Sequence, residues 1–515
     1  MSEDAGRDED AESRGAGGGG SLLENWISLV GIILAAASFF AAACLIAIDY
    51  FRSFSNPYLG ILTYIIAPAF LIAGLALMLL GAMRERRRRR RARPGEVPRF
   101  PRLDLNVPRQ RHVFAAVSVG AFLFLIFTAM GSYRTYQFTE SVAFCGRTCH
   151  TIMRPEYTAY QQSPHARVPC VDCHIGPGAS WFVKSKLSGA YQVYATLVDR
   201  YPRPIPAPIK NLRPAQQTCE QCHWPRKFYG AVERVLPHYL PDEHNSPWTI
   251  RMLVKIGGGD PGFGPVGGIH WHMNIGNKIE YIATDSQRQD IPWVRVTDSL
   301  GRVTVYQSTT DPLTPAQIAA ARPRVMDCID CHNRPTHIYA APVTAVNLAM
   351  STGAIDSTLP FVKRQAVQAL AATYPSTAAA VQGIATSLRA FYDSAYPGAV
   401  AADSAAIGRA VSAVQFIYRH NIFPDMKVDW RAYPDNIGHK NTPGCFRCHD
   451  GSHASADGTI IPHDCTACHT IVAQGPGSGP ASITPAGLAF RHPVDIGGVW
   501  QTMLCSNCHG GALAN

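Results

Sequence analysis

The sequence predicts three transmembrane α-helices followed by a large external region, in which a small β insertion and a helical spacer interrupt segments of little regular structure. Three observations lead to this fold class. Three long apolar runs lie within the first 133 residues. The rest of the chain contains all but one of the 15 cysteines, at short and repeated spacings. Between these cysteines lie one stretch of short strand-like runs and one Ala-rich stretch with helical periodicity.

The first element is a membrane anchor. Residues 25–48, 53–83 and 113–133 contain no Asp, Glu, Lys or Arg, and each can cross roughly 30 Å of hydrocarbon as a helix. Between the second and third runs, residues 84–112 hold twelve arginines against three acidic residues, almost the whole net charge of +10. On a soluble protein such a block also suggests nucleic-acid binding, but here its position indicates a cytoplasmic loop.

This orientation predicts that everything after Tyr133 is external, on the periplasmic side of a bacterial cytoplasmic membrane. The acidic, Gly-rich residues 1–24 are then a disordered cytoplasmic tail. A cleaved signal peptide is the alternative for the first apolar run. That run lacks a basic start, however, and a signal peptide would not explain the other two.

The cysteines form seven short motifs. Six read Cys-x-x-Cys-His: Cys170/Cys173/His174, Cys219/Cys222/His223, Cys328/Cys331/His332, Cys445/Cys448/His449, Cys465/Cys468/His469 and Cys505/Cys508/His509. In the seventh, Cys145/Cys149/His150, the cysteines are one residue further apart. This is the attachment signature of haem c, in which two thiols form thioethers with the porphyrin and the adjacent His is an axial ligand of the iron. We therefore expect seven haems c, which fill much of the external core.

Other chemistries fit the spacing less well. Zinc sites use similar cysteine pairs but give no reason for a His after every second Cys. Thioredoxin-like redox pairs need a strand-then-helix context that is missing here. The remaining Cys44 lies in the first apolar run, where a small buried thiol needs no function.

A haem that transfers electrons usually takes a second axial ligand, His or Met. Four external histidines lie within a few residues of a motif, namely His337, His439, His453 and His463. His165 and His492 are further candidates, and His238, His244, His270 and His272 compete for the remaining positions, with His238 and His270 preferred. His420, on an apparent helix, is expected to be structural. For the first haem the nearest candidate is Met153, although packing beside the porphyrin is the alternative.

The motifs divide the external chain into segments. After the anchor (residues 25–133) we expect a trihaem module at 134–230, a β-rich insertion at 231–327, one haem site plus a helical spacer at 328–435, and a C-terminal trihaem module at 436–515. The insertion contains strand-like runs at 279–283, 293–297 and 303–307, the last two joined by a turn. The spacer is helical in 343–421, and 476–485 is a Gly-, Ser- and Pro-rich loop. Only eleven residues separate Tyr133 from Cys145, so the first haem must lie near the bilayer surface.

The stretch from Cys145 to Cys219 resembles the NapC/NirT family of quinol dehydrogenases. The resemblance rests on Thr-Ile-Met153, Ser-Pro-His165, the Cys170 motif and Lys184-Ser-Lys186, about 100 residues in all. With three helices and seven motifs, the whole chain resembles the larger inner-membrane members of the family, the ImcH type. The resemblance implies that His165 ligates the third haem, that Met153 is close to the first, and that Lys186, with Lys184 nearby, lies at the quinol site. The alternative for the two lysines is a pair of charges that are solvated or contact phospholipid.

The leading functional hypothesis is electron transfer from menaquinol to soluble periplasmic c-type cytochromes or reductases, in anaerobic or extracellular respiration. No nucleic acid is expected as a partner. One alternative is the reverse flow, from an external donor to quinone. A second is a terminal multihaem reductase of nitrite, hydroxylamine or sulfite, which would need an iron with an open coordination position. A passive scaffold or haem store would leave the first haem's position near the membrane unexplained.

Overall fold

The computed structural model divides into two compact units, each described by itself. The first comprises Met1–Tyr136 and Pro177–Ala190, and the second Gln137–Gly176 and Tyr191–Asn515. The described residues are 22–23, 25–52, 67–91, 106–148, 150–176, 178–209, 212–258, 262, 267–274, 276–477 and 482–510.

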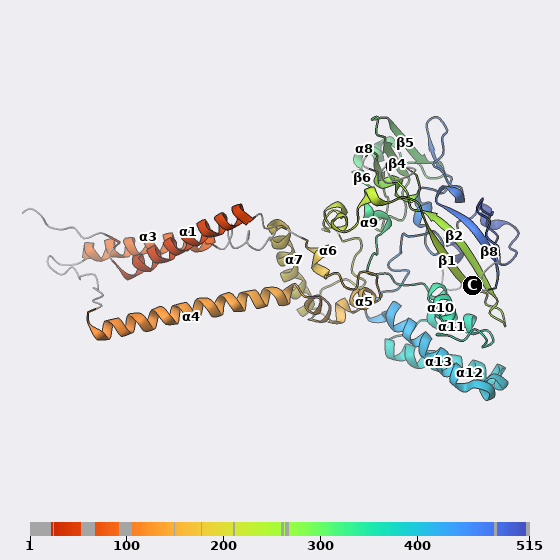
Figure 1. Cartoon of the computed structure of the whole chain (residues 1–515), viewed down its shortest axis with the longest axis horizontal. Coiled ribbons are helices and arrows are strands. Elements are labelled where there is room, and N and C mark those ends of the chain that lie inside the picture. The colour runs from red at the N-terminus through yellow and green to blue at the C-terminus, as the bar shows by residue number, and fades with distance from the viewer. Residues whose placement is uncertain are drawn as a thin grey trace, which may run out of the picture. The chain divides into compact units, whose positions relative to one another are not determined.

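Two antiparallel apolar helices dominate the first unit, α1 (Trp26–Arg52) and α3 (Ala67–Arg91), which lie side by side in Figure 1. Their contact is built from small residues, because Gly31 and Gly74 let the two backbones approach closely. A Cβ on Gly31 would lie 2.5 Å from the Met78 nitrogen, and one on Gly74 would lie 2.6 Å from the Ala35 nitrogen. Across the same contact the buried Ser28 hydroxyl donates a hydrogen bond to the Met78 carbonyl at 3.1 Å.

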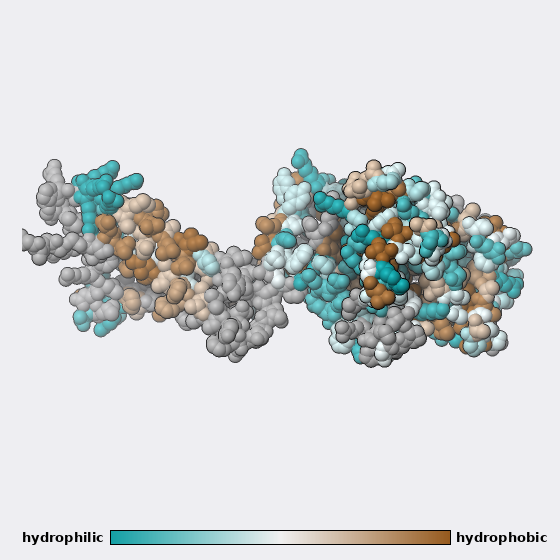
Figure 2. All heavy atoms as spheres, turned by 90° about the horizontal axis from the view of Figure 1, so that it is seen from above, coloured by the Kyte–Doolittle hydropathy of each residue, from teal (hydrophilic) through white to brown (hydrophobic). Residues whose placement is uncertain are grey.

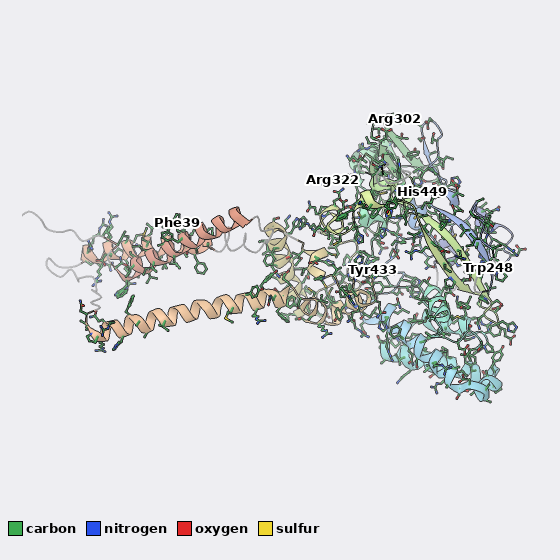
Figure 3. All side chains as sticks on the ribbon, viewed as in Figure 1. Phe39, Trp248, Arg302, Arg322, Tyr433 and His449 are labelled. Atoms are coloured by element: carbon green, nitrogen blue, oxygen red, sulfur yellow. The ribbon has the colours of Figure 1, made fainter. Side chains whose placement is uncertain are left out.

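The outer faces of these helices are covered by large apolar side chains. Figure 2 shows hydrophobic residues along this pair, and Figure 3 labels Phe39, which is 58% exposed on α1. Exposed apolar surface of this kind suits lipid better than water. By length and composition, Trp26–Ala43 and Ala67–Arg91 are both candidate membrane spans. The part of the second predicted run before Ala67 lies outside the described residues.

The third predicted span lies within α4 (Pro108–Thr139), a helix of 32 residues. Two expectations change here. The helix continues six residues past Tyr133, so the link to Cys145 is shorter than the sequence suggested. The first arginines of the basic block continue α3 as far as Arg91 instead of forming a loop, with Arg89 bonded to Glu85 one turn earlier at 3.1 Å. Pairs at this spacing stabilise a helix.

Short helical segments and loops make up much of the second unit. The α-helices before the spacer are α5 (His150–Gln161), α6 (Cys170–His174), α8 (Pro315–Ala320) and α9 (Cys328–Cys331), and α14 (Cys505–His509) lies near the C-terminus. Helix α7 (Ala179–Leu197) crosses the boundary between the units. The longest helices of this unit instead belong to the spacer.

Two antiparallel sheets form the β structure. The strands are β1 (Ala231–Tyr239), β2 (Pro247–Lys255), β3 (Lys278–Ile282), β4 (Trp293–Thr297), β5 (Val303–Ser308), β6 (Arg324–Val325), β7 (His453–Ser455) and β8 (His469–Pro476). Their orders are β1-β2-β8 and β6-β3-β4-β5-β7. The predicted hairpin is present as β4 and β5, paired in register from Trp293↔Gln307 to Thr297↔Val303.

The β region is not a self-contained insertion, however. Strand β8 pairs with β2, and β7 pairs with β5, so the last segment of the chain completes both sheets. The proposed boundary at residue 435 therefore does not separate independent folding units.

The helical spacer is confirmed. It comprises α10 (Pro342–Ser351), α11 (Val362–Ala371), α12 (Thr377–Ala395) and α13 (Pro397–Asn421), around a core that includes Ile384, Leu388 and Val414. By length and composition α13 is also a candidate membrane span. Its apolar residues instead pack into this core, where Ala410 and Tyr418 are almost fully buried, so burial within the unit accounts for its hydropathy.

Candidate haem-binding sites

The Cys-x-x-Cys-His motifs fold as single helical turns. The amide of the motif His donates a hydrogen bond to the carbonyl of the first Cys, for example from His223 to Cys219 at 2.8 Å, from His332 to Cys328 at 2.8 Å and from His449 to Cys445 at 3.1 Å. A turn of this kind brings residues three and four apart to the same side of the backbone. Both thiols and the imidazole can therefore meet one porphyrin.

Three of the predicted attachment cysteines, Cys222, Cys465 and Cys508, are exposed at the surface. In the Cys219/Cys222 motif the first thiol is partly buried and the second is exposed. A thioether joins the edge of the porphyrin, so a surface-accessible thiol is compatible with haem attachment.

The Cys328 turn is anchored to the second sheet by Asp330, between its two cysteines. The Asp330 carboxylate is 2% exposed and accepts hydrogen bonds from Tyr281 at 2.7 Å, Arg288 at 2.8 Å and Arg324 at 2.9 Å. Two positive charges and a hydroxyl thus compensate the buried carboxylate, which holds the motif against β3 and β6.

Each of six motif histidines faces a second histidine from elsewhere in the chain. The pairs are His174–His337, His223–His165, His332–His270, His449–His272, His469–His439 and His509–His492. Their ring centroids are 6.3, 6.0, 6.3, 5.8, 6.2 and 6.2 Å apart in that order. In every pair the second histidine lies outside the turn that holds the motif, so the fold brings the two rings together.

The spacing fits a metal ion between the rings. An imidazole nitrogen lies roughly 2 Å from a metal ion and about 1.1 Å from its own ring centre, so two opposite ligands put the centroids about 6.2 Å apart. The interplanar angles, in contrast, range from 3° to 85°. A constant distance with a free rotation angle is the geometry of two ligands on one axis, whereas stacked rings would share an angle as well.

Most of the second histidines are oriented by a backbone carbonyl. The ring nitrogen Nδ1 donates to a carbonyl oxygen in His165 (Pro335, 3.2 Å), His270 (Ile256, 2.7 Å), His272 (Ile269, 2.9 Å) and His337 (Glu156, 3.0 Å). This bond assigns the proton to Nδ1 and leaves Nε2 unprotonated for a metal, the arrangement typical of ligand histidines.

Burial favours the neutral form of nine of the paired imidazoles. It lowers the pKa of His337 and of His509 to about 4, and it lowers the pKa of His174, His270, His272, His332, His439, His449 and His469 as well. A ligand histidine must be unprotonated at the nitrogen that binds the metal. The residues present therefore fit haem iron at six sites.

The first motif differs in its backbone as well as its spacing. Phe144–Thr148 forms a π-helical turn that contains Cys145. Because a π-helical turn holds one more residue than an α-helical one, this turn accommodates the extra residue between the cysteines. Cys149 and the His150 side chain lie outside the described residues. Met153 is partly buried and packs against an apolar cluster that includes Ile152 and Tyr339.

Motifs that follow one another in the sequence also have cysteines that lie close together in space. The side chains of Cys145 and Cys170 lie within hydrogen-bonding reach of each other, and so do those of Cys219 and Cys328. Other thiols are close enough for a charge on one to raise the pKa of the next: Cys173 beside Cys219, Cys331 beside Cys445, Cys468 beside Cys445, and Cys505 beside Cys465. An unbroken series thus leads from the first motif to the seventh.

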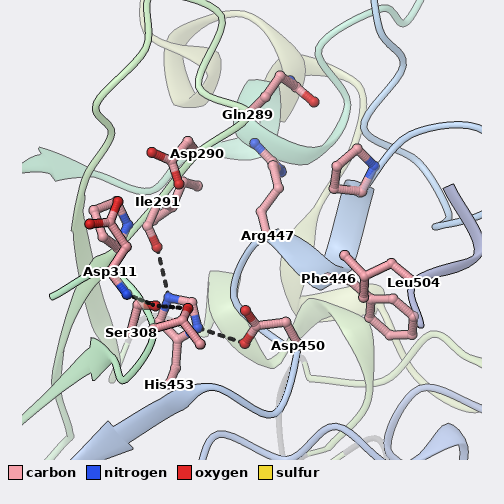
Figure 4. Close-up of a pocket in the computed structure, with 13 residues that line it drawn as sticks. Gln289, Asp290, Ile291, Ser308, Asp311, Phe446, Arg447, Asp450, His453 and Leu504 are labelled. Atoms are coloured by element: carbon pink, nitrogen blue, oxygen red, sulfur yellow. Dashed lines mark hydrogen bonds and ion pairs between the residues drawn. The ribbon is translucent and has the colours of Figure 1, made fainter. Parts of the chain in front are cut away.

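His453 does not fit its predicted role as a ligand. Both of its ring nitrogens have other partners, Asp450 at 2.8 Å and the Ile291 carbonyl at 2.7 Å, and the side chain is 2% exposed (Figure 4). The ring forms part of the wall of a polar cavity of about 200 Å³ that is also lined by Arg447 and Asp311. Its role is to tie β7 to the segment before β4.

Two other predicted ligands are placed differently. Within the described residues His463 faces Gly451 instead of a motif histidine, and the neighbouring Pro462 carbonyl bonds Nδ1 of His449 at 2.5 Å. His238 lies on β1, where its Nδ1 contacts the Asn347 amide nitrogen at 3.0 Å. His420 stacks on Phe416 at 3.9 Å on α13, which fits the structural role expected for it.

His272 was left out of the preferred set, yet it faces His449. It lies two residues after His270 in a short 3₁₀ segment, Ile269–Met273, and the two rings face different motifs. The signal available in the sequence was the His-x-His spacing, which can supply two neighbouring irons from one loop. His244, the remaining competitor, is exposed.

The two predicted quinol-site lysines lie on α7 in the first unit. The Lys186 ammonium group is 4.8 Å from the Phe182 ring centroid, and the Lys184 ammonium group is 4.8 Å from that of Trp181. Phe182 also contacts Tyr136 of α4, with ring centroids 6.5 Å apart. Aromatic and basic side chains together are typical of a membrane–water interface.

Comparisons with known proteins agree with these features. The N-terminal region of the NapC/NirT cytochrome c family matches residues 107–204. The chain is also 46% identical over 487 residues to the cytochrome c-type protein ImcH of Geobacter sulfurreducens, and the match covers 95% of both chains. The chain belongs to the NapC/NirT cytochrome c family. It is 32% identical over 118 residues to the cytochrome c-type protein TorC of Escherichia coli, which covers 19% of this chain and 29% of TorC. No solved structure matches.

Membership of the NapC/NirT family decides the chemistry of the motifs. The chain is a membrane cytochrome that binds haem c covalently and functions in electron transfer. The family match ends at residue 204, so it includes only the first two motifs, whereas the match to ImcH extends over nearly the whole chain.

Proposed function

We propose that this chain is a seven-haem quinol dehydrogenase of a bacterial cytoplasmic membrane. It takes electrons from menaquinol and passes them, on the periplasmic side, to soluble c-type cytochromes or reductases in anaerobic or extracellular respiration. The proposal rests mainly on six histidine pairs, in each of which the two rings are far enough apart to hold an iron between them. The motifs of these pairs also lie close to one another in the order in which they occur in the sequence.

Bound haem supplies an iron that accepts and releases one electron at a time. The chain's own residues determine the rest. Nδ1–carbonyl bonds orient most of the second histidines, burial favours the neutral form of His270 and of most other paired imidazoles, and the paired thiols would hold the porphyrins. At six sites two histidines would hold the iron, an arrangement that would favour electron transfer over substrate binding.

The quinol end is expected near the membrane. Only residues 140–144 separate the end of α4 from Cys145, so the first motif follows the third membrane helix directly. Lys186 is proposed to bind a quinol oxygen through its ammonium group, held by Phe182, and Lys184 is proposed to contribute positive charge to the same surface. The exit is proposed at the motif of Cys505 and Cys508, the last in the series.

The test uses the full-length protein in liposomes with a menaquinol analogue. We expect haem reduction that can be followed in the visible spectrum, and Lys186→Gln should slow it at least tenfold, because the quinol loses a charged hydrogen-bond donor. Lys184→Gln is the matched control, and it should slow reduction much less. If menaquinol reduces no haem on any timescale, the proposal fails. If both variants and the wild type are reduced at equal rates, the proposed role of Lys186 is rejected but menaquinol oxidation is not.

The competing role as a terminal reductase of nitrite, hydroxylamine or sulfite is less well supported. It needs an iron with an open position, and six of the motifs have a second histidine opposite the first. The reverse direction of flow, from an external donor to quinone, uses the same residues. A redox titration of the haems in the presence of quinol separates the two directions.

A further inference from the structure

Two of the second histidines come from one short segment. His270 and His272 belong to the 3₁₀ turn Ile269–Met273, and they face His332 and His449 respectively. A 3₁₀ turn advances about 120° per residue, so side chains two residues apart leave it in clearly different directions. One turn of backbone therefore serves two motifs, the fourth, which begins at Cys328, and the fifth, which begins at Cys445.

The two pairs differ most in the angle between their rings. The planes of His332 and His270 are 3° apart, which is almost parallel, whereas those of His449 and His272 are 85° apart, which is almost perpendicular. These are the extremes among the six pairs. A shared iron would fix the distance between the rings of a pair but not this angle, so the surrounding protein determines it.

The ring of His270 is held by contacts outside the turn. Its Nδ1 donates to the Ile256 carbonyl at 2.7 Å, directly after β2, and the Phe228 ring centroid lies 4.4 Å from its own. The backbone beneath the ring is held as well. A Cβ on Gly258, whose φ is +113°, would lie 2.1 Å from the carbonyl carbon of His270, so the turn lies directly on the backbone that follows β2.

The ring of His272 is held from within the turn. Its Nδ1 donates to the Ile269 carbonyl at 2.9 Å, and opposite it Nδ1 of His449 donates to the Pro462 carbonyl at 2.5 Å. Trp271 lies against His272, with ring centroids 6.0 Å apart and planes 80° apart. The indole also packs against the buried apolar cluster of the second sheet, so it cannot move aside easily and limits the rotation of the His272 ring.

The angle between two ligand rings changes the properties of an iron between them. An imidazole donates electron density into the iron d orbital perpendicular to its plane. Two parallel rings donate into the same orbital, which stabilises ferric iron, whereas crossed rings divide the donation between two orbitals that then have nearly equal energy. Crossed rings consequently favour ferrous iron relative to parallel ones. They also give ferric iron a strongly anisotropic paramagnetic signal with a large highest g value, whereas parallel rings give an ordinary rhombic signal.

We infer that Trp271 holds crossed histidine ligands at the fifth motif, so that its haem is easier to reduce than the haem of the fourth. This inference rests on the proposed function, because it needs a haem at both motifs. In the step between them the fourth iron is oxidised from ferrous to ferric as the fifth is reduced from ferric to ferrous, and no proton or other atom is exchanged. The difference in ring angle favours this direction, away from the first motif. Trp271 is a positioning residue that acts through His272.

The first experiment compares His270→Ala with His272→Ala in the full-length, haem-loaded protein. Each variant removes one second ligand from the same turn, so each should contain one high-spin haem. The low-spin signal that disappears should differ, a rhombic signal in His270→Ala and a signal with a large highest g value in His272→Ala. If either variant stays fully low-spin, the pairing used in the proposed function is wrong. If both become partly high-spin but lose the same kind of signal, the pairing stands and the inference is overturned.

A redox titration of the wild type, followed by paramagnetic resonance, tests the order of the potentials. The signal that is missing from His272→Ala should disappear on reduction at a higher potential than the signal that is missing from His270→Ala. The opposite order would overturn the inference, whatever the identity of the electron donor.

The variant Trp271→Ala tests the positioning role. Without the indole the His272 ring can turn, so the fifth haem's signal should move to a smaller highest g value and its potential should fall, with unchanged haem content. Trp271→Phe keeps a ring in this place and should restore most of both properties. Phe228→Ala, which removes the ring beside His270, is the matched control and should leave the fifth haem unchanged. A fifth haem with the same signal and potential in Trp271→Ala as in the wild type would overturn the role of Trp271.

Discussion

At the scale of single residues, most of the second histidines make two contacts, with a motif histidine on one side and with a backbone carbonyl on the other. His272 illustrates this, because Nδ1 contacts the Ile269 carbonyl while the ring faces His449 at 5.8 Å. His453 is nearer to His449 in sequence, but its two nitrogens are both engaged by protein atoms. Proximity in sequence to a motif is therefore a weaker guide than the free ring nitrogen.

The substitution His272→Ala tests this distinction. It should leave the haem attached at Cys445 and Cys448 without its second nitrogen ligand, so that one haem changes from low to high spin. Paramagnetic resonance checks the spin state, and the haem content should be unchanged because both thiols remain. His420→Ala serves as the control. A protein in which every haem stays low-spin after His272→Ala would show that the pairing is wrong.

Among the elements, the contact of α1 with α3 depends on residues without large side chains. Gly74→Leu places its side chain against the Ala35 backbone, where a Cβ alone would already be 2.6 Å away. The helices must then separate, at a cost of roughly 1–3 kcal/mol. Thermal unfolding in detergent, followed by circular dichroism, should show a lower midpoint. Gly120→Ala on α4, where a Cβ would meet nothing within 4 Å, should leave it unchanged.

In the second sheet, Glu280 on β3 stands directly opposite Arg295 on β4. The carboxylate contacts Arg295 at 2.7 Å and Lys278 at 3.1 Å. Burial raises the pKa of Glu280, but the bonds from these two cations outweigh burial and hold the pKa below its ordinary value of 4.5. The paired carboxylate therefore stabilises the fold above the unfolded pKa, and this stabilisation is lost as the pH falls through the folded pKa.

The variant Glu280→Gln should consequently lower the free energy of unfolding at pH 7 by about 1 kcal/mol, a figure that allows for the partly exposed Arg295. The difference from the wild type should disappear in acid, because the wild-type carboxyl is then protonated as well. Guanidinium unfolding of the variant and the wild type, at pH 7 and in acid, measures this difference in the free energy of unfolding. Glu233→Gln, in the more exposed pair with Arg251, should have a smaller effect. A difference that persists in acid would assign the loss to packing instead of charge.

For the whole molecule, the last segment of the chain is part of a common core. It supplies β7 and β8 to the two sheets, and the loop before β3 supplies His272 to the motif of Cys445. A chain ended at Asp435 would expose the edges of β2 and β5 to other chains. We expect such a chain to aggregate or be degraded, as judged by gel filtration of the haem-loaded protein. A chain ended at Gly510 is the control. A soluble product with four low-spin haems would contradict the shared core.

Much of this protein could be predicted from its sequence because the relevant signals are local. A run without charges predicts a membrane helix whatever its neighbours, and two thiols plus a histidine in one turn are enough to identify a haem c attachment site. The spacer helices and the β4–β5 hairpin follow from periodicities within single segments in the same way. The outward orientation of the haem region and the use of menaquinol stay predictions.

The tertiary structure alone decided which second histidine faces each of six motif histidines. The two rings of a pair can come from residues far apart in the chain, as with His223 and His165 or His332 and His270, and no local pattern encodes which residue lies opposite. The same holds for strands β7 and β8, whose partners precede them by more than 140 residues. Short sequence motifs identify the groups that can bind a haem, whereas the path of the backbone determines which two of them come together.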